Sequence, residues 1–138
     1  MIVVIRISGM VEIPDNIQEM LYRMRLRQKY ATVIMHETPE NAKILERVRN
    51  FVAFGKISES MLEQLIEIRG ERFDKKKIDA KKIASELGKK NLEELGVKPF
   101  FRLHPPRRGI DSKKHFGVGK GVLGNNGEAI NKLVERML

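Results

Sequence analysis

The chain of 138 residues contains no cysteine and no tryptophan. Without cysteine it cannot hold a disulfide scaffold, a thiolate zinc site or a thiol nucleophile. No apolar run approaches the roughly 20 residues that are needed to cross a bilayer. The apolar start, MIVVIRI, is too short for a signal peptide and lacks the preceding basic region. We therefore expect a cytoplasmic protein with no membrane partner.

Signatures of catalysis are also missing. The three histidines have neither metal-ligand spacing nor a paired carboxylate, and no GxxxxGK[ST] loop occurs. Residues 119–124 match GxGxxG, but they follow a basic loop and leave only 14 residues, too few for a dinucleotide-binding unit. We predict that the chain is not an enzyme and has no catalytic residue, metal, cofactor or small-molecule substrate.

Acidic residues are outnumbered, 18 Asp and Glu against 27 Lys and Arg, which gives a net charge of +9. The excess is greatest at the end, where residues 99–138 carry eight cations and three anions. So large a charge opposes compaction unless an anionic partner neutralises it. Nucleic acid is the usual partner of such a chain, and an anionic membrane is the alternative.

Hydrophobic patterning predicts three strands in the first part of the chain, at residues 2–7, 30–35 and 51–57. Helical patterns lie between them, so residues 1–57 form a βαβαβ core. This pattern alone also permits parallel βαβ crossovers. Residues 58–98 form a helical insert of nearly balanced charge, and residues 99–138 form a basic arm with a final helix that packs back on the core.

Helix boundaries are indicated by capping chemistry. Asp15 is expected to cap the first helix, and Thr38 is expected to cap the second ahead of a proline at the first helical position. A third helix runs from Ser58 to a stop at Gly70, and two short helices end at Gly88 and Gly96. The final helix has a stripe of apolar residues, namely Ile130, Leu133, Val134 and Met137.

The most informative segment is residues 100–126, which is basic, holds five of the eleven glycines and has no sustained periodicity. Such a segment has too little apolar surface to fold by itself. Two consecutive prolines fix an extended backbone that splays the neighbouring cations, and arginine suits both phosphate and base stacking. Glycines let backbone approach closely or adopt positive φ. A Pro-rich surface bend and a series of plain turns are the alternatives.

A second basic cluster lies at the end of the first helix, where cations also complement the helix dipole or form a solvated face. The predicted RNA-binding residues of this cluster are Arg23, Arg25, Arg27 and Lys29. Those of the arm are Arg102, His104, Arg107, Arg108, Lys113, Lys114, His115, Gly117, Gly119, Lys120, Gly121 and Asn125.

The runs IVVIRISG, LRQKYATVIMHETPENAKILERVRNFVAFGKIS, PFFRLHPPRRG and GVLGNNGEAINKLVERML resemble the L-thirty family of large-subunit ribosomal proteins. The resemblance is to the longer archaeal and eukaryotic form, whose eukaryotic counterpart is L-seven, and it covers essentially the whole chain. Two positions depart from the family pattern: Asn126 stands where an arginine is usual, and Arg108 stands where a glycine is common.

The resemblance implies a non-catalytic constituent of the large ribosomal subunit that binds 23S-type rRNA and approaches the 5S rRNA. It also implies an α+β fold, in part ferredoxin-like, with a three-stranded, largely antiparallel sheet and helices packed on one face. A free-standing RNA chaperone or regulator is the alternative function. Neighbouring ribosomal proteins are possible partners through the insert at residues 58–98, whose charge balance suits a protein neighbour.

Overall fold

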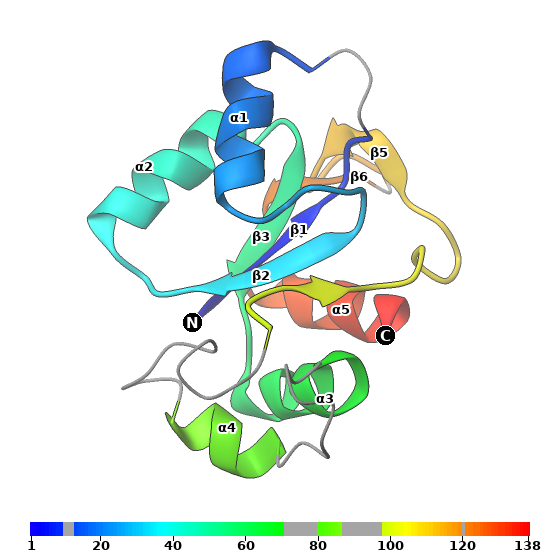
Figure 1. The fold of residues 1–138 in the computed structure, drawn as a ribbon. Helices are drawn as coiled ribbons and strands as arrows, with labels where there is room; N and C mark the ends of the chain where they lie inside the picture. Colours follow the sequence, from blue (N-terminus) through cyan, green and yellow to red (C-terminus); the bar gives the residue numbers. More distant parts are fainter. Residues whose placement is uncertain (10–12, 71–79, 87–97, 120) are drawn as a thin grey trace.

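The fold is described from a computed structural model, which describes residues 1–9, 13–70, 80–86, 98–119 and 121–138 (Figure 1). The predicted helix end at Gly88, the short helix ending at Gly96 and the side chain of Lys120 lie outside these residues. The described strands are β1 (Ile2–Arg6), β2 (Ala31–Met35), β3 (Val52–Lys56), β4 (Phe101–Arg102), β5 (Asp111–His115) and β6 (Gly121–Asn125). The described helices are α1 (Asp15–Arg23), α2 (Pro39–Val48), α3 (Glu59–Arg69), α4 (Ala80–Glu86) and α5 (Ile130–Met137), the last preceded by a 3-10 turn (Gly127–Ala129).

The strands form a mixed sheet of six, in the order β4-β2-β1-β3-β6-β5. Central β1 is antiparallel to both β2 and β3, and β2 is antiparallel to β4, whereas β3 and β6 are parallel. The predicted strands at residues 2–7, 30–35 and 51–57 are therefore present, in the predicted antiparallel arrangement. The prediction of a three-stranded sheet was wrong, because the C-terminal segment adds strands at both edges.

Helices cover both faces of the sheet, so the prediction of helices on one face was also wrong (Figure 1). Helices α1 and α2 pack on one face around Val4, and α3 and α5 pack on the other around Val3 and Ile5. The cause lies in β1, whose residues 3–6 are all buried. Because successive side chains of a strand point to opposite faces, a strand whose consecutive residues are all buried needs cover on each side.

Local chemistry explains where the helices begin. The hydroxyl of Thr38 accepts a hydrogen bond from the amide of Asn41 at 3.1 Å, and that of Ser58 accepts from Met61 at 3.3 Å. The predicted cap at Thr38 is confirmed, as are the predicted start of the third helix at Ser58 and its end at Gly70. The cap predicted at Asp15 was wrong: Asp15 is the first residue of α1, where its charge complements the helix dipole.

The C-terminal helix α5 lies against β3 and α3, with its whole predicted apolar stripe buried. Its start comes so close to β3 that a Cβ built on Gly55 would lie 2.3 Å from the carbonyl oxygen of Gly127. Only glycine permits this approach without displacement of backbone. The end of the chain is thereby locked beside the middle of the sheet.

Candidate nucleic-acid interface

The loop between α1 and β2 carries most of the first predicted cluster. Leu26 is fully buried, whereas Arg25, Arg27 and Lys29 are exposed. The buried leucine therefore anchors the loop while its cationic neighbours face outward. Both Arg25 and Tyr30 adopt positive φ, 65° and 68°, which marks a tightly constrained loop. Arg23 instead lies on α1, where it forms an ion pair with Glu19 at 2.7 Å.

Arg6 fixes this loop from inside the protein. Its side chain is only 1% exposed, and it donates to the carbonyl oxygens of Leu26 at 2.7 Å, Ser8 at 3.0 Å and Gly9 at 3.1 Å. Burial lowers the pKa of the guanidinium from its ordinary value, although an arginine keeps its charge at neutral pH. The backbone oxygen of Arg6 also accepts from Tyr30 at 2.7 Å. Sequence reasoning missed Arg6, and the available signal was a charge inside an apolar strand.

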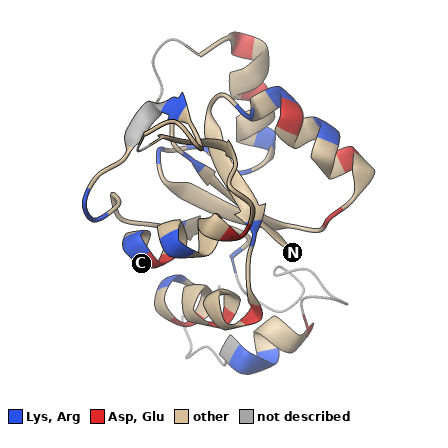
Figure 2. Ribbon diagram, turned by 180° about the vertical axis from the view of Figure 1, so that it is seen from behind, with Lys and Arg blue, Asp and Glu red and all other residues tan. Residues whose placement is uncertain are grey.

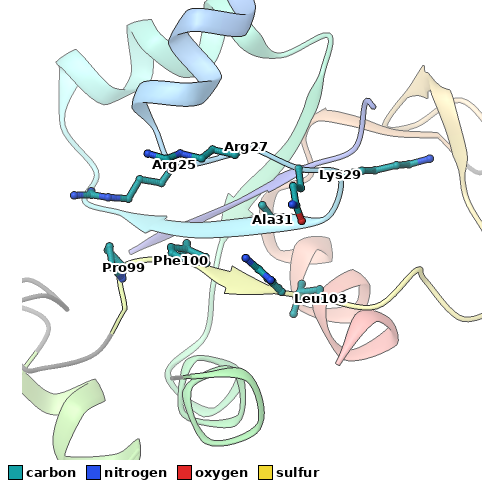
Figure 3. A pocket seen from close by; sticks show the side chains of 9 residues that line it. Arg25, Arg27, Lys29, Ala31, Pro99, Phe100 and Leu103 are labelled. Carbon is teal, nitrogen blue, oxygen red and sulfur yellow. The ribbon is translucent and has the colours of Figure 1, made fainter. Parts of the chain in front are cut away.

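The edge strand β4 places Arg102 beside this loop. Ala31 of β2 pairs with Arg102, so residues that are some 70 positions apart in the sequence meet at one edge of the sheet. Between the loop and β4 lies a groove of about 650 Å³, seen from close by in Figure 3. None of the described residues that line it carries a carboxylate. The lining residues are Arg25, Arg27, Gln28, Lys29, Ala31, Pro99, Phe100, Arg102 and Leu103.

The two prolines lead the chain from β4 past the end of α5. The amides of His104 and Arg107 donate to the carbonyl oxygens of Met137 and Arg136, at 2.9 and 3.1 Å. Arg136 in turn donates through Nε to the carbonyl oxygen of Arg107 at 2.9 Å. The two amide bonds satisfy carbonyls that the end of α5 leaves unpaired. The segment is therefore ordered by the protein itself.

The imidazole and guanidinium groups of this segment nevertheless lie at the surface. His104, Arg107 and Arg108 are exposed, while Pro106 is buried. Residues 106–109 form a turn closed by a 3.2 Å hydrogen bond from the amide of Gly109 to the oxygen of Pro106. Arg108 occupies the left-handed region there, with φ of 68°. This conformation favours glycine, which accounts physically for the glycine expected at this position.

Lys120 lies outside the described residues, and the other arm residues lie toward the opposite edge of the sheet, on β5, β6 and the described part of the turn between them. Lys114, His115, Gly117, Gly119 and Asn125 are exposed, and the two glycines have positive φ of 94° and 53°. Gly121, in contrast, is buried. The side chain of Lys113 lies outside what the structure describes.

Gly121 has a reason to be glycine that is independent of any ligand. A Cβ at this position would lie 2.3 Å from the carbonyl oxygen of His115, inside the pairing of β5 with β6. Asn126 is similarly internal: it is 5% exposed, and its Nδ2 donates to the carbonyl oxygens of Val122 at 2.7 Å and Gly124 at 3.0 Å. Asn126 thus holds the end of β6 rather than facing solvent.

The structure therefore divides the predicted site between two edges. Arg25, Arg27, Lys29 and Arg102 share one groove, whereas β6 and β5 lie four and five strand spacings from β4, about 19 and 24 Å at roughly 4.8 Å per strand. Figure 2 shows that α2 and α5 carry both signs of charge, whereas the loop that leads from β4 to β5 carries cations. Two separated basic surfaces can neutralise phosphates on different segments of a polyanion.

Other chemistries find no support in the part of the chain that the structure describes. Among these residues no three His, Asp or Glu side chains are grouped so as to hold a metal ion. No described helix combines the length and the apolar character needed to cross a membrane.

Comparisons with known proteins point in one direction. The family model described as Ribosomal protein L30p/L7e matches residues 2–52. The large ribosomal subunit protein uL30 of Aeropyrum pernix is 39% identical, over 98% of this chain and 97% of its own. That of Archaeoglobus fulgidus is 33% identical over 99% of both chains, and that of Methanosphaera stadtmanae is 31% identical over the full length of both.

Proposed function

Because the chain belongs to the ribosomal protein L30p/L7e family, in its archaeal long form, we propose that it binds rRNA in the large ribosomal subunit through the groove beside β4. The family is one of ribosomal proteins and not of enzymes. The observation that carries the proposal is the meeting of Arg25, Arg27 and Lys29 with Arg102 around a groove whose described lining holds no carboxylate. Such a surface suits phosphates, which supply much of the affinity of RNA-binding proteins.

We propose that recognition is of shape and backbone. The deep groove of an A-form helix hides its bases, so proteins recognise structured RNA mainly through phosphates, 2′-hydroxyls and unpaired nucleotides. The exposed Arg107, Arg108, Lys114 and His115 add contacts away from the groove. The proposal includes 23S-type rRNA and proximity to the 5S rRNA, and the latter is supported by the family resemblance alone.

The test compares two double variants of the full chain that lose the same charge. Arg27→Gln with Arg102→Gln alters the groove, whereas Lys43→Gln with Arg47→Gln alters the exposed face of α2. Each variant is titrated with large-subunit rRNA over a series of salt concentrations. The groove variant should lower the slope of log affinity against log salt by about 1.4 to 1.8, since each phosphate contact contributes about 0.7 to 0.9.

The control variant should leave the slope unchanged. Equal losses in the two variants would mean that net charge alone matters, and no loss in either would contradict rRNA binding through the groove. Titration with 5S rRNA alone tests the finer statement separately.

We also propose that α3 and α4 face a neighbouring ribosomal protein. Ile68 of α3 is 55% exposed, and the charges of residues 58–98 nearly balance. Cross-linking mass spectrometry of intact subunits tests this contact. Cross-links from α3 only to rRNA would contradict it.

A further inference from the structure

The groove beside β4 has an aromatic platform that phosphate binding does not need. Its base includes Phe100, Pro99 and Ala31, and its rim carries the cations named above (Figure 3). We propose that this groove receives one unpaired base of the RNA, stacked on the ring of Phe100, with neighbouring phosphates held by Arg25, Arg27 and Arg102. This inference rests on the proposed function, because it specifies the part of the RNA that enters the groove.

The pairing of β4 fixes the platform. Phe101 pairs with Thr32 and is 1% exposed, with its side chain in the core on the α3 and α5 face. Because successive side chains alternate, Phe100 and Arg102 share the other side of the segment. There Phe100 packs partly against the core beneath α1 and α2 and stays half-buried. Ordering of the ring therefore precedes binding, which lowers the entropy lost on association.

The groups around the ring match a nucleotide. The guanidinium carbon of Arg102 lies 5.8 Å from the centroid of the Phe100 ring, so a cation and an aromatic surface are offered together. Gln28, exposed at the rim, carries an amide that can both donate to and accept from the edge of a base. Extruded bases in RNA are recognised by this combination of stacking, edge hydrogen bonds and phosphate contacts.

An acidic peptide is the competing ligand, since it too would be drawn to four cations. It would not use the ring as a stacking surface, whereas every base has a π face that can. The volume of about 650 Å³ lies within the usual range for small-molecule sites and accommodates a base with its sugar. The chemistry of the groove therefore favours a nucleotide.

The test uses the full chain and two RNA hairpins with the same stem. One hairpin is fully paired, and the other carries a bulged fluorescent adenine analogue. Phe100→Leu keeps apolar contact with the core but removes the aromatic face, and Phe100→Tyr keeps that face. We expect the wild type and Phe100→Tyr to quench the analogue, and Phe100→Leu to lose at least about fivefold in affinity for the bulged hairpin only.

The remaining outcomes separate this inference from the proposed function. Absence of quenching by the wild type overturns the inference whether or not Phe100→Leu folds. The inference is also overturned if Phe100→Leu binds each hairpin as tightly as the wild type does. If the groove double variant nevertheless binds rRNA more weakly than the wild type, the proposed function stands. If neither Phe100→Leu nor the groove double variant weakens binding to RNA, both the inference and the proposed function are refuted. Displacement of the analogue by polyglutamate as readily as by unlabelled bulged RNA also overturns the inference.

Discussion

Replacing Arg108 with glycine should raise the stability of the fold and lower its affinity for RNA. Arg108 is exposed and has φ of 68°, in a turn where the chain needs a left-handed residue. That conformation costs an L-residue about 1–2 kcal/mol, and glycine avoids this cost but loses about 0.5–1 kcal/mol through its freer unfolded state. We therefore expect Arg108→Gly to stabilise the fold by about 0.5–1 kcal/mol, or about 2–4 °C in Tm.

The same change removes one cation from the proposed interface. If Arg108 neutralises a single phosphate, a slope of about 0.9 corresponds to roughly a fivefold loss of affinity near 0.15 M salt. Arg108→Ala should lose the same affinity but keep the strain, and Arg108→Lys should keep both the strain and most of the affinity. The three variants thus separate charge from backbone conformation.

Calorimetric unfolding and rRNA titration across a salt series measure the two effects on the same preparations. Destabilisation by Arg108→Gly would refute the argument from backbone strain. Unchanged affinity in both Arg108→Gly and Arg108→Ala would refute a phosphate contact at this turn.

Three further substitutions test how the groove and its scaffold are held. Arg6→Gln should cost about 3–5 kcal/mol in urea unfolding, since it removes one buried charge-assisted hydrogen bond and two partly exposed ones, and it should also weaken rRNA binding; an unchanged midpoint would contradict this. Gly55→Ala should cost about 1–3 kcal/mol or more because its Cβ meets backbone, whereas Gly9→Ala should be neutral, since no described atom lies within 4 Å of its Cβ; equal effects would rule out the packing explanation. Asn126→Asp should destabilise the fold by about 3 kcal/mol at neutral pH, because a carboxylate oxygen would then face two carbonyl oxygens in place of the Nδ2 donor. The loss of stability should shrink as the pH falls and the new carboxylate becomes protonated, and a loss that does not change with pH would contradict this reasoning.

The elements with strong local signals were predictable from the sequence. The apolar runs of β1, β2 and β3 and the caps at Thr38 and Ser58 each lie within a few residues of chain. The added strands lack such signals. β4 has two residues, β5 reads DSKKH, and β6 begins with glycine and contains another. These strands exist because distant strands offer them hydrogen-bonding edges, and no local pattern encodes that.

The candidate site shows the same division. Its cations stood out by charge and by the neighbouring prolines, so Arg27 and Arg102 were both named from the sequence. Their meeting depends on the pairing of β2 with β4, which the sequence does not display. Arg6 was missed because its role lies in bonds to a loop 20 residues away. The residues of the arm are neighbours in the sequence, whereas the sheet order places Arg102 at one edge and the residues of β5 and β6 toward the other.

The most direct test is nucleotide-resolution cross-linking of this chain in assembled large subunits. We predict cross-links to rRNA from the loop at residues 25–29 and from the segment at residues 100–108, with Phe100 joined to an unpaired base. Peptides from both segments that carry no nucleotide, while remaining open to solvent labelling in the same particles, would contradict the account.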